Sequence, residues 1–90
     1  MERNATFDLG SRYKLREATS DSVRIEEEWV FHGTDNLTAT FKPHKQHIVV
    51  LDVKKPVGKE YGKFLSVKVL SDDGNVGRLY LDPVQWERVT

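Results

Sequence analysis

Residues 63–81 read KFLSVKVLSDDGNVGRLYL. Leu65, Val67 and Val69 alternate with other residues, and a two-residue period of this kind is typical of a half-buried strand. Residues 71–75 carry Asp-Gly at their centre, which is the strongest short-range signal for a β-hairpin. Residues 77–81 return as a second strand. The segment therefore predicts two antiparallel strands joined by a tight turn.

The same alternation continues upstream and predicts further strands over residues 12–18, 23–32, 37–42 and 47–54. Residues 48–51 are apolar at every position, which suggests a central strand covered on both sides. Hardly any helical period occurs between residues 23 and 81, so the sequence predicts an all-β domain. The residues expected on the inward parity are Val23, Ile25, Trp29 and Phe31, then Leu37, Ala39 and Phe41, then Val49, Leu51 and Val53.

The end of the chain carries a start signal for one short helical turn. Asp82 suits an N-cap, Pro83 suits the first helical position, and Gln85 suits the third. Residues 87–90 are expected to leave this turn as a final short strand. We expect Trp86 to fill the end of the core rather than to anchor an interface, because a 90-residue domain needs every large ring in its core.

Six short strands joined mostly by short turns must hide one apolar face, and a small closed or nearly closed barrel of five to six antiparallel strands does so economically. A helical turn before a terminal strand resembles SH3-like barrels, in architecture only. The Ala-Leu-Tyr-Asp-Tyr signature of proline-binding SH3 domains is missing, and residues 12–16 are the nearest segment. A β-sandwich is the remaining alternative, and an OB-fold is less favoured because this chain has no helix between its expected third and fourth strands.

We interpret residues 1–11 as an N-terminal arm anchored by Phe7 and Leu9, and residues 12–90 as a single β-barrel domain.

The composition indicates where in the cell the protein is expected and how its charge is distributed. The chain contains no cysteine, and residues 1–6 lack the apolar stretch of a secretory signal, so we expect a cytoplasmic location and no membrane association. The formal net charge is zero, but its distribution is uneven. Residues 1–41 hold five basic and eight acidic side chains, residues 42–68 hold seven lysines against two acids, and residues 69–90 hold two arginines against four acids.

Chemistry-bearing motifs are weak. A catalytic thiol is excluded, and no serine, threonine or carboxylate has a neighbouring base or partner in a recognisable pattern, so we expect no enzymatic activity and no cofactor. His32, His44 and His47 could supply imidazoles to zinc, but no cysteine or flanking acid completes a ligand set. We therefore expect solvated histidines and no metal site.

The basic middle of the chain is the best functional lead. Its lysines are interleaved with aromatic rings, as in grooves that bind single-stranded nucleic acid. A basic segment between acidic flanks suits electrostatic docking to a protein partner equally well. We therefore expect an accessory, adaptor or inhibitor subunit that acts as a monomer or homodimer. The alternative is binding of single-stranded DNA or RNA by the same surface, against which the cluster lacks arginine and the pI is about 6.8. The residues expected to contact the partner are Lys42, Lys45, Lys54, Lys55, Lys59, Tyr61 and Lys63.

Overall fold

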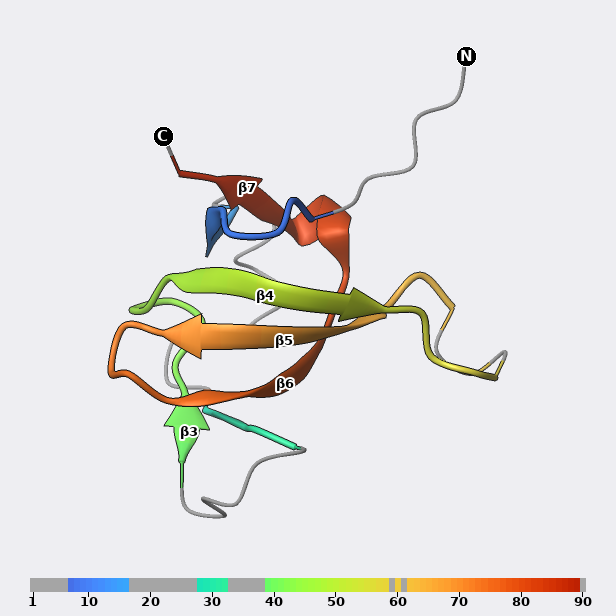
Figure 1. Cartoon of the computed structure of the whole chain (residues 1–90), viewed down its shortest axis with the longest axis horizontal. Coiled ribbons are helices and arrows are strands. Elements are labelled where there is room, and N and C mark those ends of the chain that lie inside the picture. Colours follow the sequence, from blue (N-terminus) through green and yellow to red (C-terminus); the bar gives the residue numbers. More distant parts are fainter. Residues whose placement is uncertain (1–6, 17–27, 33–38, 59, 61, 90) are drawn as a thin grey trace.

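The computed structural model arranges the chain as two antiparallel sheets, and it describes residues 7–16, 28–32, 39–58, 60 and 62–89. The five-stranded sheet has the order β6-β5-β4-β1-β7, and the two-stranded sheet pairs β2 with β3 (Figure 1). The predicted all-β class is confirmed. The elements are β1 (Arg12–Leu15), β2 (Trp29–Val30), β3 (Thr40–Phe41), β4 (Ile48–Lys54), β5 (Leu65–Ser71), β6 (Val76–Leu81), the 3₁₀ turn η3 (Pro83–Gln85) and β7 (Trp86–Arg88).

The β5–β6 hairpin forms where residues 63–81 predict it. Ser71 N–H donates to Asn75 O at 2.9 Å, and Gly74 N–H donates to Ser71 O at 3.0 Å. Gly74 has a φ of +83°, a left-handed conformation that glycine adopts without a steric cost. The inward parity of β5 is also as predicted, because Val67 and Val69 are fully buried.

The inward face of β4 differs from the prediction. Ile48 and Val50 are fully buried, whereas Leu51, expected inside, is 41% exposed. The register against β5 shifts between Val50 and Asp52, which marks a bulge. The extra residue reverses the alternation, so Val53 again packs against the core. Residues 48–51 are apolar on both parities, and their pattern alone could not reveal which face is buried.

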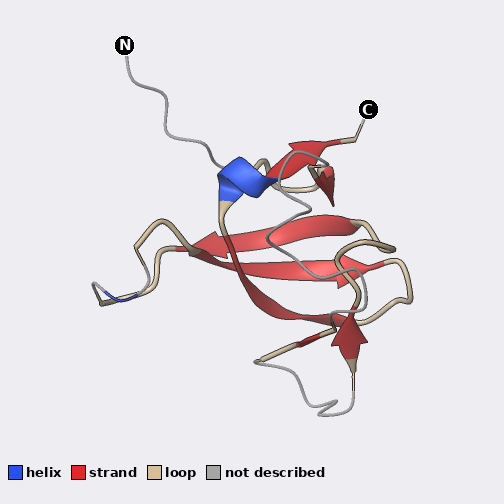
Figure 2. Ribbon diagram, turned by 180° about the vertical axis from the view of Figure 1, so that it is seen from behind, coloured by secondary structure: helices blue, strands red, loops and turns tan. Residues whose placement is uncertain are grey.

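The predicted turn after β6 is confirmed residue by residue. Asp82 is the N-cap of η3, its carboxylate accepts the Val84 N–H at 3.1 Å, and Pro83 occupies the first turn position. Asp82 is almost fully buried, and Lys63 reaches its other carboxylate oxygen at 3.1 Å. The turn leads directly into β7, which pairs with β1 (Figure 2).

Trp86 belongs to the core, as expected, with only 2% of its surface exposed. The centroid of its ring lies 6.0 Å from that of Phe41 and 6.2 Å from that of Trp29.

Of the two expected anchors of residues 1–11, Phe7 is buried and packs edge-on against Tyr13, with ring centroids 4.9 Å apart. The expectation for Leu9 is wrong, because this side chain is 65% exposed.

A closed barrel is not found among the described residues. The two-stranded sheet meets β6 through one isolated bridge, in which His32 N–H donates to Arg78 O at 3.0 Å and Arg78 N–H donates to His32 O at 2.8 Å. The expected strand over residues 23–32 is described only from residue 28 onward, and the expected strand over residues 37–42 only from residue 39 onward. The coarser architecture, two antiparallel sheets around one apolar core, is what the structure supports.

Candidate functional site

The ladder between β1 and β4 stops after two residue pairs. Arg12 pairs with Val49 and Tyr13 pairs with Ile48. A continued register would place residues 14–16 opposite residues 45–47. The chain instead turns away from β1, because the N–H groups of residues 45 and 46 both donate to Lys42 O, at 3.1 Å and 3.0 Å. This turn opens a cleft at the place where the ladder would have continued.

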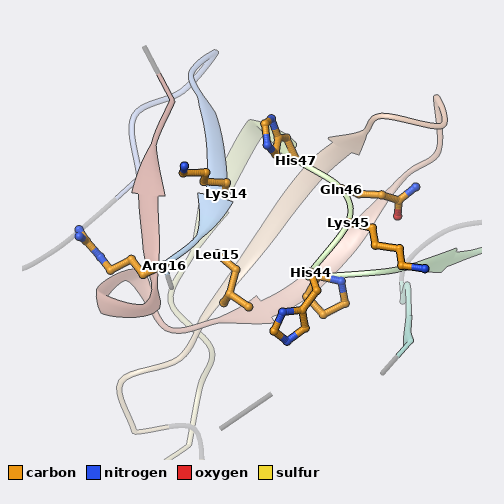
Figure 3. Close-up of a pocket in the computed structure, with 8 residues that line it drawn as sticks. Lys14, Leu15, Arg16, His44, Lys45, Gln46 and His47 are labelled. Carbon is orange, nitrogen blue, oxygen red and sulfur yellow. The ribbon is translucent and has the colours of Figure 1, made fainter. Parts of the chain in front are cut away.

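The cleft has a volume of about 520 Å³ and one wall from each segment. Figure 3 shows β1 on one side and residues 44–47 on the other. The charged side chains that line the cleft are all basic in the part of the chain that the structure describes, and their potential favours an anionic ligand. The lining residues are Lys14, Leu15, Arg16, Pro43, His44, Lys45, Gln46 and His47.

The β1 wall is held from behind by the C-terminal segment. Glu87 of β7 lies 3.6 Å from Lys14 Nζ and 3.8 Å from an Arg16 guanidinium nitrogen. Arg16 also donates through Nε to Val84 O at 2.9 Å. These contacts fix the direction of β1 beside the cleft. They also leave the basic side chains half exposed and able to meet a ligand.

The opposite wall is tied to the β5–β6 hairpin. Gln46 is buried, accepts the Lys42 N–H at 2.9 Å and donates to the Asp73 carboxylate. The Asp72 carboxylate accepts the His47 N–H at 2.8 Å and pairs with Arg12 at 2.8 Å. The hydrogen bond from His47, supported by Arg12, lowers the pKa of Asp72 below its ordinary value of 3.8. Both walls are therefore fixed before any ligand arrives.

The predicted partner-binding residues divide between the two ends of β4. Lys42 and Lys45 lie at the cleft end, while Lys54, Lys55 and Lys63 lie at the other. Seven strand residues separate the two groups by roughly 20 Å at about 3.3 Å per residue. Lys59 and Tyr61 lie outside the described residues.

The two groups also differ in what their ammonium groups contact. Lys42 lies 3.7 Å from Glu28, and Lys63 is held by buried Asp82. Within the described part of the chain, Lys45 forms no ion pair, which leaves its charge available at the cleft. Of the predicted set, Lys45 is thus the residue that the cleft uses most directly.

Sequence reasoning missed the β1 side of this site. Lys14 and Arg16 belong to a segment for which the sequence predicts only a strand, and His44 and His47 are considered there only as metal ligands or solvated side chains. The available signal was the pair of basic residues two positions apart on one strand face. Among the described residues, no group of three or more histidine, cysteine, aspartate or glutamate side chains could hold a metal ion.

A second, smaller hollow of about 250 Å³ lies beside the bridge to β6. The rings of His32 and Tyr80 stack there with centroids 4.4 Å apart and planes 18° apart. Burial lowers the pKa of His32, and the nearby positive charge of Arg78 lowers it further. Arg78 itself forms an ion pair with Asp52 across β5 and lowers the pKa of that carboxyl. The lining residues are Trp29, Val30, His32, Leu79 and Tyr80.

Comparison with models of known protein families, with curated proteins and with solved structures finds no match to this chain. None of the helical segments in the described ranges has the length and apolar character needed to cross a bilayer.

Proposed function

We propose that the chain is a non-enzymatic interaction module that binds an acidic segment of a protein partner in the basic cleft between β1 and residues 43–47. The observation that carries this proposal is the charge of the cleft: among the described residues, three cationic side chains line it and no acidic side chain does. Complementary charge favours encounter with an acidic partner and orients it. Lys14, Arg16 and Lys45 supply that charge.

Preorganised walls support the same proposal. The Glu87 contacts hold one wall, and the Gln46 and Asp72 hydrogen bonds hold the other. A binding site that is already ordered loses less conformational entropy when the ligand arrives. A small domain can therefore bind a short segment without reorganising its core.

For the fold, we propose an SH3-like barrel, and for location, the cytoplasm. The strand order supports the first, because β7 follows a 3₁₀ turn and returns to pair with β1 at the side of the β4–β5–β6 meander. The absence of cysteine from the sequence supports the second.

Single-stranded nucleic acid is the second candidate ligand, and one observation favours it. Lys54 and Lys55 lie near Phe64, which is 38% exposed, at the far end of β4. Exposed rings beside lysines can stack on bases while the charges contact phosphates. Against it, the lysines of the two ends are separated by most of β4, so they do not form one continuous track for a strand.

Fluorescence anisotropy with two labelled probes tests the proposal. The probes are a glutamate-rich peptide and a thymidine oligonucleotide, each at about 50 mM salt so that phosphate contacts are not screened away. The double variant Lys14→Gln/Lys45→Gln should weaken peptide binding severalfold, whereas the matched control Lys54→Gln/Lys55→Gln should leave it unchanged. The proposal would be contradicted if Lys54→Gln/Lys55→Gln weakened peptide binding and Lys14→Gln/Lys45→Gln did not. Binding of the oligonucleotide without binding of the peptide would also contradict it.

A further inference from the structure

The backbone of β1 presents one more strand-pairing position than β4 uses. In a central antiparallel strand, successive residues direct their N–H and C=O groups to alternate neighbours. The backbone groups of the even-numbered residues 12–16 face the C-terminal segment, because Arg16, just after β1, donates its N–H to Gln85 O at 2.8 Å and Arg12 O accepts the Val89 N–H at 2.9 Å. Ser11 faces the other way, and its carbonyl accepts the Val50 N–H at 3.0 Å.

The alternation therefore directs the backbone of Leu15 into the cleft. Tyr13 is the last residue of β1 that pairs with β4, and Leu15 is the next residue of the same parity. The turn formed by residues 42–46 removes the strand that would have paired with it. Within the described ranges, the cleft is thus an interrupted ladder in which β1 is present and its pairing strand is absent.

The two faces of this interrupted ladder differ in chemistry. Leu15 is buried and belongs to the core cluster, whereas Lys14 and Arg16 are exposed on the opposite face of β1. Figure 3 shows Leu15 directed towards His44, while Lys14 and Arg16 point away from it. Across the cleft, Lys45 is also exposed. A strand lying between the walls would meet an apolar residue on one face and basic residues on the other.

We propose that the cleft binds an extended segment of the partner as an added strand beside Leu15, with acidic residues at alternate positions and an apolar residue between them. This inference rests on the proposed function and specifies its ligand. The apolar residue of the segment pairs with Leu15 and shares its inward face, because directly opposed residues in a ladder point to the same side. The flanking acidic residues face outward beside Lys14 and Arg16, where opposite charges on neighbouring strands attract.

The closed end of the cleft limits the segment. The Tyr13–Ile48 pair is the last one formed between β1 and β4, so an added strand cannot extend beyond it along the sheet. A short segment therefore suffices, and recognition depends on the order of its residues as well as on its charge.

Isothermal titration of the full chain with three blocked peptides tests this inference. The first peptide is EVEVE, the second is EEEVV with the same composition and charge, and the third is EVEVE methylated at the backbone nitrogen of both valines. We expect the first to bind about tenfold more tightly than either of the others, because each loses the strand pairing or its register. In addition, Lys14→Gln/Lys45→Gln should weaken binding of the first about fivefold, whereas Lys54→Gln should not.

The outcomes separate this inference from the proposed function. Equal binding of all three peptides, sensitive to Lys14→Gln/Lys45→Gln, would overturn the added strand and leave an acidic ligand in the cleft. Failure of all three to bind would overturn both. Far-ultraviolet circular dichroism and thermal melting of each variant establish that it is folded, and exposed lysines are replaced so that the core stays intact.

Discussion

Replacing Asp82 by alanine is expected to lower the free energy of unfolding by about 1.5–2 kcal/mol. The Asp82 carboxylate performs two tasks in the structure: it caps η3 through the Val84 N–H at 3.1 Å and holds Lys63 at 3.1 Å. Loss of a cap costs about 1 kcal/mol. The ion pair adds about 0.5–1 kcal/mol, because the Lys63 side chain is 70% exposed and largely screened by water.

Urea and thermal unfolding measure this effect directly. With a urea m-value of about 1–3 kcal/mol/M, the midpoint should fall by roughly 1 M. The melting temperature should fall by about 6–16 °C, given the entropy of unfolding of a domain of this size. Asp82→Asn keeps an oxygen that can cap the turn, and Lys63→Ala keeps the carboxylate. Each variant should therefore lose only the contribution of the ion pair to the free energy of unfolding, about 0.5–1 kcal/mol.

A loss within about 0.5 kcal/mol for Asp82→Ala, as expected of an ordinary surface substitution, would refute the assigned roles of this carboxylate. If Asp82→Asn and Asp82→Ala lower the free energy of unfolding equally, the contribution assigned to the cap of η3 is refuted, while that of the ion pair stands.

Three further predictions follow from close contacts and shifted pKa values. Gly77→Ala should destabilise the fold by about 1–3 kcal/mol in urea unfolding, because a Cβ there would lie 2.6 Å from that of Phe31; an unchanged midpoint would contradict close packing of Phe31 on Gly77. The folded-state pKa of Asp72 lies below 3.8, so its contribution to stability is present above that pH and is lost as the pH falls through the folded pKa. Asp72→Asn should therefore reduce the acid-induced loss of stability, and identical acid unfolding curves for variant and wild type would contradict this. The pKa of His32 is lowered from 6.5 by burial and Arg78, so the folded state binds fewer protons and stability should fall as the pH drops below 6.5. His32→Phe should flatten this slope in unfolding experiments across that range, and an unaltered slope would assign it to other groups.

Local signals account for the parts of the fold that the sequence predicted well. The Asp-Gly turn at residues 71–75 and the Asp82 cap act within a few residues, so their chemistry is visible in a short window. The face of β4 was not predictable in the same way. Its apolar run fits either parity, and a bulge after Val50 decides which side chains the core receives.

The cleft was beyond sequence reasoning for a different reason. It exists because residues 42–46 turn away from β1, and that turn is held by a hydrogen bond between Gln46 and Asp73, which lie 27 positions apart. Strand order also had to be known before Lys14 and Lys45 could be placed on two walls of one site. The lysine-rich composition did indicate Lys45, but it could not show that Lys54 and Lys55 lie at the opposite end of β4.

Mapping of backbone amide chemical shifts during titration with the peptide EVEVE tests the central claim most directly. If the opened ladder is the binding site, the largest shifts occur at residues 14–16 and 44–47, and the amides of residues 54, 55, 57 and 58 stay unchanged. Shifts concentrated at residues 54–58 and 62–64, with residues 14–16 silent, would contradict the claim that this chain binds its partner in the cleft beside β1.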